Sequence, residues 1–462
     1  MGLTRRELLI GCGLTAAGMA GGLSVGLAGR ATAAAPDMVI APQPARFALV
    51  PGAVTDVLSY APDAPPPVIR IRQGEVFVAE LDNRLDERTT IHWHGLRVPN
   101  AMDGVPYLTQ PPVEPGERFR YAFTPPDAGT FWYHPHCNTL EQMGHGLTGV
   151  LVVEEAEDPG FDAEVVLNLR DFRLGDDGRF LPPSIPRQAA RAGTFGTVLT
   201  ANWRQAPVHD APAGGLVRLR LAATDVTRIY RLRMTGGEAE AIALDGNPAP
   251  TPFALPDDFL LGPGQRLDLA VRMPDGEGEE AALATLAGNR LVTLARLRAT
   301  GASLGRSLAE LAPLPPNPVP EPDLSAAETL AFEFSATADT ADRPSVCGTP
   351  GYTFWAINRQ AWPGDMPDPG APLVVLRLGR SYVLSLSNRT PHMHPIHLHG
   401  MSFRLLHSNR RELLPLVTDT ALLLPDERVD VALVADNPGD WVFHCHIIEH
   451  QKTGMTGFIR VE

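Results

Sequence analysis

The chain has 462 residues, which is more than one ordinary domain and favours two to four domains that each bury their own core. Asp and Glu outnumber Lys and Arg by 53 to 39, and no basic run is interleaved with aromatic residues as a nucleic-acid groove requires. These features exclude nucleic acid as an expected partner.

The first 33 residues have the order of an export signal. Arg5 and Arg6 precede an apolar stretch rich in glycine and alanine at 10–28, and small residues at 31–33 form a cleavage site. This order is typical of a twin-arginine signal peptide. A stable membrane anchor is disfavoured because glycines interrupt the apolar stretch and a cleavage site follows it. We therefore expect an exported, periplasmic protein.

Short apolar-alternating runs separated by proline and glycine turns occupy the rest of the chain. Examples are residues 68–72, 119–123, 216–221 and 429–434. Alternation with a period of two is typical of strands that bury one face, and long helical periodicities are few. The pattern predicts an all-β fold of the sandwich class.

Two parts of the chain repeat each other. Gly74, Leu81, Asn83, Arg84, His92, His94 and Gly95 recur at one constant offset as Gly379, Leu386, Asn388, Arg389, His397, His399 and Gly400. A second block pairs Pro115, Glu117, Arg118, Gly129, His134 and His136 with Pro425, Glu427, Arg428, Gly439, His444 and His446. Constant offsets of this kind indicate repeated units, so residues 36–155 and 324–462 are predicted to be two copies of one domain.

A third copy is predicted at 160–312, between these two. Its segment from Pro263 to Arg266 matches the segment from Pro115 to Arg118 and is likewise followed by an alternating strand. It has none of the histidines of the pattern. The proline-rich segment 311–323 cannot form a ladder strand and is predicted to be a stiff linker to the last copy.

Ten of the fourteen histidines fall in four clusters. The clusters are His92 and His94; His134 and His136; His394, His397 and His399; and His444, His446 and His450. Side chains at i and i+2 of a strand share a face, so each His-x-His pair presents two imidazoles together. A single such pair is more simply a surface or core feature, but four clusters at repeat-related positions predict one site for several metal ions.

A second, softer site is predicted around Cys445. Its neighbours His444 and His446 lie on the opposite face of the strand, so the thiolate points away from the histidine cluster. Cys445, His394, His450 and Met455 match the two-histidine, one-cysteine, axial-thioether composition of a blue-copper site. Zinc is disfavoured because these ligands exceed its need for four.

At these residues the sequence resembles the three-domain multicopper oxidases, which include laccases, cuprous oxidases and ascorbate oxidases. The resemblance implies three consecutive cupredoxin-like Greek-key β-sandwich domains, with the middle one a spacer without ligands. It also implies four copper ions. They are a type 1 copper on His394, Cys445, His450 and Met455, a type 2 copper on His92 and His397, and two type 3 coppers on His94, His134 and His446 and on His136, His399 and His444.

Two acids are candidates for catalytic proton delivery, because reduction of dioxygen to water consumes protons. Asp103 stands where relatives keep an acid, although a loop-capping role fits the sequence equally. Many relatives carry a carboxylate just after the last type 1 histidine. Here that position is Gln451, and Glu449 lies on the other side of His450.

The resemblance implies a laccase-like enzyme that couples one-electron oxidation of a phenol or aromatic amine to reduction of dioxygen. A cuprous oxidase that takes Cu(I) as its small reducing substrate is the alternative. A non-catalytic envelope protein is a third reading, which the intact ligand set argues against. A copper nitrite reductase is disfavoured because Cys445 lies in the last domain.

Some properties stay open from sequence. The reductant is not readable because such substrates dock on loops rather than on a ligand motif. Whether Cys137 and Cys347 form an interdomain disulfide is also undecided. We expect a monomer.

Overall fold

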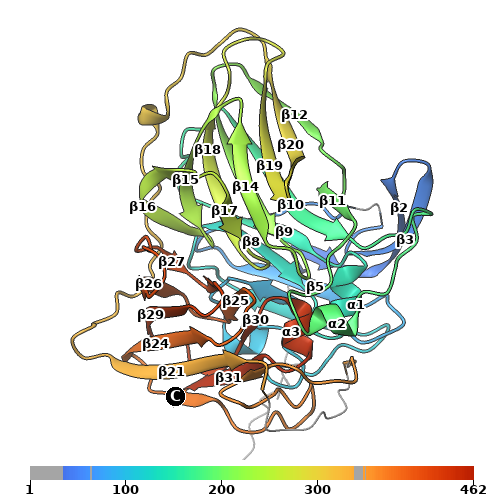
Figure 1. The fold of residues 1–462 in the computed structure, drawn as a ribbon, viewed down its shortest axis with the longest axis vertical. Helices are drawn as coiled ribbons and strands as arrows, with labels where there is room; N and C mark the ends of the chain where they lie inside the picture. Colours follow the sequence, from blue (N-terminus) through green and yellow to red (C-terminus); the bar gives the residue numbers. More distant parts are fainter. Residues whose placement is uncertain (1–34, 63–64, 338–346, 349) are drawn as a thin grey trace, which may run out of the picture. The chain divides into compact units, whose positions relative to one another are not determined.

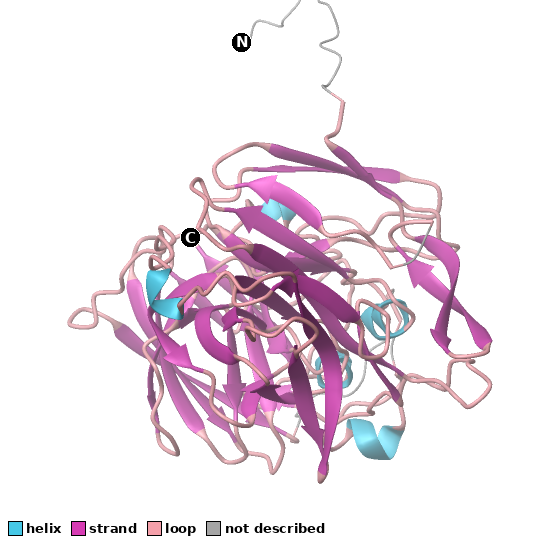
Figure 2. Cartoon of the chain, turned by 90° about the horizontal axis from the view of Figure 1, so that it is seen from above, coloured by secondary structure: helices cyan, strands magenta, loops and turns pink. Residues whose placement is uncertain are grey.

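Almost all regular structure in the described part of the chain is β-strand. The computed structural model describes residues 35–62, 65–337, 347–348 and 350–462, so the expected signal peptide lies outside the described residues. Figure 2 shows strands throughout this part of the chain and only a few short helices. The all-β class expected from the sequence is confirmed.

The first stretch of chain forms three sheets, with the orders β1-β5-β7, β4-β9-β8-β6 and β2-β3. Their core includes the fully buried aromatic side chains of Trp93 and Tyr121. The strands are β1 (Met38–Ile40), β2 (Gln43–Val50), β3 (Ala53–Ser59), β4 (Ile69–Arg72), β5 (Phe77–Asp82), β6 (His92–His94), β7 (Arg118–Phe123), β8 (Gly129–His134) and β9 (Gly149–Glu154).

The second stretch forms a six-stranded sheet, β11-β10-β13-β18-β15-β16, and a five-stranded sheet, β12-β20-β19-β14-β17. Its core is mostly aliphatic and includes the buried Tyr230. The strands are β10 (Ala163–Phe172), β11 (Val198–Ala201), β12 (Val208–Pro212), β13 (Leu216–Ala223), β14 (Tyr230–Thr235), β15 (Glu238–Leu244), β16 (Asn247–Ala254), β17 (Phe259–Leu261), β18 (Arg266–Arg272), β19 (Glu280–Ala287) and β20 (Arg290–Thr300).

The third stretch repeats this topology, with the orders β22-β21-β24-β29-β26-β27 and β23-β31-β30-β25-β28 (Figure 1). The strands are β21 (Glu328–Ser335), β22 (Ala356–Ile357), β23 (Val374–Leu376), β24 (Ser381–Asn388), β25 (His394–Leu398), β26 (Phe403–Ser408), β27 (Val417–Thr418), β28 (Thr420–Leu423), β29 (Arg428–Val434), β30 (Gly439–Cys445) and β31 (Thr456–Val461). Because the sheets and the main cores fall in three consecutive stretches, we propose that they are the three predicted domains.

Helices are short and lie in the connections. They are α1 (Thr139–Gly144), α2 (Pro186–Ala189) and α3 (Ile448–Lys452), with two single 3-10 turns, η1 (Asn100–Met102) and η2 (Leu308–Glu310). α1 directly follows the second histidine cluster, and α3 contains His450 of the fourth. α2 lies in the middle stretch and ends two residues before Arg191, whose carbonyl accepts from His450. All three helices therefore lie in loops near the metal-ligand candidates rather than in the sheets.

The repeat seen in the sequence has a structural basis. Asn83 donates to the carbonyls of Glu87 and Val113, and Asn388 donates in the same way to those of His392 and Leu424. Each asparagine thus fixes the loop that leads into a histidine strand, β6 or β25. The identical bonds explain why this residue recurs at the repeat offset.

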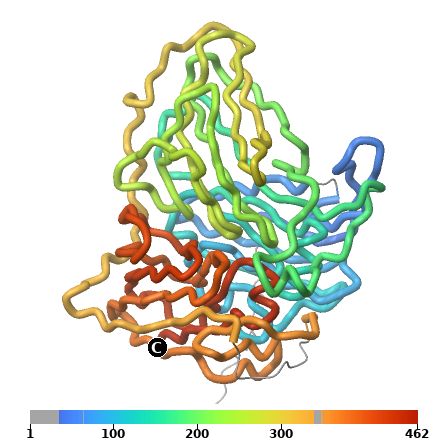
Figure 3. Tube along the Cα trace, in the orientation of Figure 1, coloured from blue at the N-terminus to red at the C-terminus, as the bar shows by residue number. Residues whose placement is uncertain are grey.

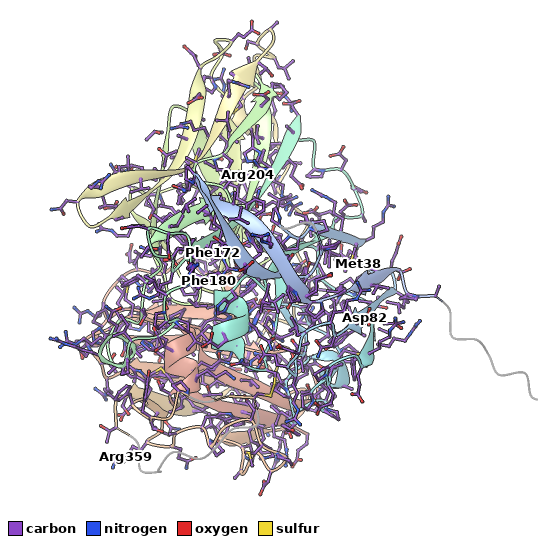
Figure 4. The ribbon with its side chains drawn as sticks, turned by 90° about the vertical axis from the view of Figure 1, so that its right-hand side faces the viewer. Met38, Asp82, Phe172, Phe180, Arg204 and Arg359 are labelled. Carbon is purple, nitrogen blue, oxygen red and sulfur yellow. A yellow bond between two sulfur atoms is a disulfide. The ribbon has the colours of Figure 1, made fainter. Side chains whose placement is uncertain are left out.

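Three connections tie the stretches together. The predicted linker at 311–323 has no strand and joins the second and third stretches (Figure 3). Its Asn317 side chain bonds to both the amide and the carbonyl of Ala128. Cys137 and Cys347 form a disulfide, which the sequence left open. Leu49 and Val57 of the β2–β3 hairpin share an apolar cluster with Phe172 of the second stretch. Phe172 lies beside Phe180 (Figure 4).

Candidate metal centre

A trigonal set of donor atoms surrounds Cys445 at the end of β30. The Sγ atom of Cys445 lies 3.5 Å from His394 Nδ1 and 3.6 Å from His450 Nδ1, and the two nitrogens are 3.1 Å apart. All three residues are fully buried. The sequence-predicted type 1 residues are therefore brought together from β25, β30 and α3.

Outer hydrogen bonds fix which nitrogen of each histidine faces Cys445. His450 Nε2 donates to the carbonyl of Arg191 at 2.8 Å. His394 Nε2 lies 2.8 Å from Thr390 Oγ1, which itself donates to Asn388. Both Nδ1 atoms therefore keep a lone pair for a metal ion, as outer-shell partners of ligating histidines commonly ensure.

Met455 completes the predicted ligand set from the start of β31. It is fully buried, and its backbone carbonyl accepts a hydrogen bond from the amide of Cys445 at 3.0 Å. Its own amide bonds to the carbonyl of His450. The backbone thus holds Met455 beside two of the type 1 candidates, as the axial assignment requires.

The other eight histidines gather in a second buried cluster from the first and third stretches. β6 pairs with β8 so that His92 faces His134, and β25 pairs with β30 so that His397 faces His444. His399 Nε2 lies 3.2 Å from His444 Nε2, and the ring of His92 stacks on that of His399 at 3.8 Å. The expected convergence of pairs from two domains is therefore present.

Only some of the His-x-His pairs lie within a strand, as the sequence analysis assumed for all of them. His92 and His94 lie within β6, but β8 ends at His134 and β30 ends at Cys445, so His136 and His446 stand just beyond strands. His136 is instead held by Gln451 Nε2, which lies 3.2 Å from its Nε2. Strand alternation alone therefore does not position the rings of His136 and His446.

Many of the ring nitrogens have no hydrogen-bond partner within the described part of the chain. They are His92 Nε2, His94 Nδ1 and Nε2, His134 Nε2, His136 Nδ1, His397 Nε2, and His446 Nδ1 and Nε2. A buried polar atom without a partner is costly, so a concentration of such nitrogens is the donor set that a bound metal site requires. Burial also lowers the pKa of His399 to about 3, which keeps its imidazole neutral as metal binding requires.

Distances between donor atoms reproduce part of the predicted grouping, and one close group, His92, His94 and His134, crosses it. His136, His399 and His444 have donor atoms within 4.8 Å of one another, as do His92, His397 and His399. His94, His134 and His446 form a looser group, with ring centroids 4.8 to 5.9 Å apart. The donor set is all imidazole in the cluster and thiolate plus imidazole at Cys445, which fits copper.

Asp103 lies inside the cluster. Its Oδ2 accepts from His399 Nδ1 at 2.9 Å, its Oδ1 lies 3.1 Å from His92 Nδ1, and its backbone carbonyl also accepts from His92. Burial would raise the pKa of this carboxyl, but His399 and His92 hold it well below its usual range. Asp103 is therefore an anion that orients two ligand candidates.

A second acid, Asp419, was not predicted from the sequence. Its Oδ1 lies 3.2 Å from His397 Nδ1 and 3.6 Å from His94 Nε2. Its other partner is Arg266 at the start of β18, whose guanidinium also contacts Asp245. Asp419 follows no pattern in the repeat, so the sequence carried no signal for it.

The middle stretch takes part in the cluster although it has no histidine ligand. A Cβ at Gly264 (φ +90°) would lie 2.9 Å from the His446 ring and 3.1 Å from that of His94. The Pro263–Arg266 segment found in the sequence thus forms a wall of the cluster. The expectation that this domain is only a spacer is incomplete. Gly264 packs against the cluster histidines, and Arg266 pairs with Asp419, which contacts them.

Glu449 lies away from these histidines. Its carboxylate accepts from the hydroxyls of Ser184 at 2.6 Å and Thr194 at 2.7 Å, and from the Thr194 amide. Gln451, two residues later, is the one that touches the cluster. The geometry therefore connects Glu449 to the middle stretch and gives it no contact with His136.

Comparison with known proteins places the chain in a family. Two family models, each described as multicopper oxidase, match residues 45–158 and 339–462. Multicopper oxidase MmcO of Mycobacterium tuberculosis is 31% identical over 90% of this chain and 85% of its own length. Laccase-2 of Fomitopsis schrenkii is 27% identical over 85% of this chain and 83% of its own.

A solved structure gives the same result. The crystal structure of a multi-copper oxidase from Pseudomonas thermotolerans is 44% identical, covers 93% of this chain and 100% of its own, and superposes with a TM-score of 0.83. The cupredoxin-like fold and the copper cofactor expected from the sequence are thereby confirmed. This chain belongs to the multicopper oxidases, which are copper-dependent oxidoreductases that use dioxygen.

Proposed function

We propose that the protein is laccase-like: it takes single electrons from a phenol or aromatic amine at the Cys445 site and passes them to dioxygen at the histidine cluster. The observation that carries this proposal is the end of β30. Cys445 faces His394 and His450, whereas its neighbours His444 and His446 face the cluster. When bound, copper would supply the one-electron redox chemistry and the reduction of dioxygen to water.

We assign the ligands as the resemblance implies. His394, Cys445, His450 and Met455 would hold the type 1 copper, and His92 and His397 the type 2 copper. His94, His134 and His446, and His136, His399 and His444, would hold the type 3 pair. The close donor atoms of His394, Cys445 and His450 support the type 1 site, and those of His136, His399 and His444 support one type 3 site. The unpartnered Nε2 atoms of His92 and His397 support the type 2 pair.

Asp103 is the candidate for proton delivery. It is a buried carboxylate in direct contact with His92, the proposed type 2 ligand, and His399, a proposed type 3 ligand. It can therefore stabilise a proton held near either copper. Gln451 lies against His136 but cannot carry a proton as a carboxylate does. We therefore propose that the Asp103 anion attracts and relays protons at the cluster, and we propose a positioning role for Glu449.

Cu(I) is the second candidate donor. His394 and His450 are fully buried, and a metal ion needs less room to approach them than an aromatic ring does. The same residues would serve either donor, because each gives up one electron at the Cys445 site. Kinetics with both donors separate the two functions.

We further propose that the protein is exported by the twin-arginine signal predicted at 1–33 and works as a monomer. Among the described residues, no helix is long and apolar enough to span a membrane. Cys137 and Cys347 form a disulfide, which is typical of proteins from an oxidising compartment. The disulfide supports export.

Oxygen uptake by the copper-loaded protein tests the proposal. With dimethoxyphenol we expect four donor electrons consumed per dioxygen and no released hydrogen peroxide. Faster turnover with Cu(I) than with the phenol would transfer the assignment to cuprous oxidation. Uptake with neither donor would contradict both functions.

A further inference from the structure

The segment from Ser184 to Thr194, here called the cover, lies over the type 1 residues. The Arg191 carbonyl accepts from His450 Nε2 at 2.8 Å, so the outer edge of this ring is bonded to the cover instead of facing solvent. His450 is fully buried, while Arg187, Gln188 and Arg191 on the cover are exposed. The cover therefore separates His450 from a donor in solution.

Both ends of the cover are fastened to one carboxylate. Glu449, which precedes His450, accepts from Ser184 at one end and from the hydroxyl and amide of Thr194 at the other. Thr194 Oγ1 also accepts from the Ile185 amide at 2.9 Å, which closes the segment on itself. Hydrogen bonds to a carboxylate are about twice as strong as neutral ones, so Glu449 is the main anchor.

The middle of the cover is seated on Trp355. The indole Nε1 donates to the Ala189 carbonyl at 2.9 Å, and Ala189 is fully buried. The same indole lies 4.4 Å from the His450 ring and 5.2 Å from the His394 ring, measured between centroids. The cover, Trp355 and the type 1 histidines thus form one packed stack.

The C-terminal end of the cover is tightly packed. Gly193 has φ +89°, and a Cβ there would lie 2.6 Å from Thr227 Cγ2, 3.0 Å from Glu449 Oε2 and 3.2 Å from Ile447 Cγ2. The half-buried His392 lies beside Trp355, with ring centroids 6.2 Å apart. Among the described residues, the exposed Arg191 and the half-buried His392 lie on the solvent side of this stack.

We propose that the cover selects electron donors by size, admitting small donors such as single-ring phenols or a metal ion and excluding multi-ring ones, with Glu449 as its positioning residue. This inference rests on the proposed function, because it takes Cys445, His394 and His450 as the type 1 site. It assigns Glu449 to substrate selection rather than to proton delivery.

The test loosens the anchor and leaves the ligands intact. In the variant Ser184→Ala/Thr194→Val the carboxylate loses both hydroxyl donors, whereas Arg187→Ala changes an exposed side chain of the same segment and is the control. In the apoprotein, alkylation of Cys445 read by peptide mass should be about tenfold faster in the double variant than in wild type, because two bonds to a charged group are lost. The control should match wild type.

Donor kinetics on the copper-loaded proteins give the second readout. Dimethoxyphenol and syringaldazine carry the same reacting ring but differ in size. The double variant should lower KM for syringaldazine by about tenfold and leave KM for dimethoxyphenol unchanged. Equal changes for both donors, or alkylation at the wild-type rate, would overturn the inference.

Two further observations keep the test decisive. If the double variant does not fold, Glu449→Gln weakens the same anchor at constant size and should give the same order of alkylation rates. If wild type binds copper without the visible absorption of a copper–thiolate bond, the proposed function fails. Alkylation of the apoprotein still tests whether the cover limits access to Cys445.

Discussion

Asp103 and His399 are 296 residues apart in the chain, yet Asp103 Oδ2 accepts a hydrogen bond from His399 Nδ1 at 2.9 Å. The same carboxylate reaches His92, so one anion joins ligand candidates from two stretches of the chain. Outer partners of metal ligands of this kind set ring orientation and basicity. Asp103 is accordingly more than the loop cap that the sequence also allowed.

The variant Asp103→Asn should lower kcat about 10- to 100-fold, because a neutral amide can neither relay a proton nor hold the His399 ring as the anion does. The measurement is kcat together with copper content, since retained copper separates loss of the proton from loss of the site. Asp82→Asn, at an ion pair away from the cluster, is the control. Unchanged kcat with full copper would refute the proton-delivery role.

Gly264→Ala should deplete copper from the cluster while leaving the copper–thiolate absorption of the Cys445 site. The new methyl would press on the rings of His446 and His94. Gly116 holds the equivalent place in the first copy, has φ +77°, and has nothing within 4 Å of an added Cβ, so Gly116→Ala matches the backbone strain without the clash. Equal copper content in the two variants would show that the wall does not shape the cluster.

Arg266→Met should destabilise the protein by about 3 to 5 kcal/mol, because it leaves Asp419 and Asp245 buried without their cation. The repeat again supplies the control. Arg118 is the matching residue of the first copy, its side chain is 61% exposed, and Arg118→Met should cost no more than about 1 kcal/mol. Denaturant unfolding of the apoproteins measures both, and similar losses would contradict the role given to Arg266.

The apoprotein should lose stability as pH falls from about 6.5 toward 3. Burial lowers the pKa of His399 and of His450 to about 3, so below pH 6.5 the unfolded chain binds protons that the folded chain does not. The loss is about 2 kcal/mol for each of the two histidines at pH 5. Unfolding free energies at pH 7 and pH 5 check this.

His450→Gln should reduce that pH dependence, whereas His407→Gln, at an exposed position, should leave it unchanged. Equal pH dependence in wild type and both variants would mean that these buried rings do not govern acid stability.

The sequence predicted the fold class and the ligand candidates because both depend on local signals. Strand alternation located β13 and β29 almost to the residue, and the repeated histidines marked the cluster. Asp419 and the Arg191 carbonyl could not be predicted in this way. Their roles depend on contacts between distant segments, and a backbone carbonyl leaves no trace in residue identity.

Partial signals were present for the middle stretch. The Pro263–Arg266 segment matched the other copies, but the missing histidines favoured a spacer, and only the packing of Gly264 against His446 shows what the segment does. For Glu449 the neighbouring His450 pointed to proton delivery, whereas its partners Ser184 and Thr194 point to the cover.

The most direct test of the central claim is the copper content and optical spectrum of wild type and of Cys445→Ser, measured with oxygen uptake on dimethoxyphenol. We predict four coppers and intense visible copper–thiolate absorption in wild type. The variant should keep the coppers of the histidine cluster and lose both that absorption and donor oxidation. A colourless wild type with little copper, or a variant that oxidises the phenol as fast as wild type, would contradict the account.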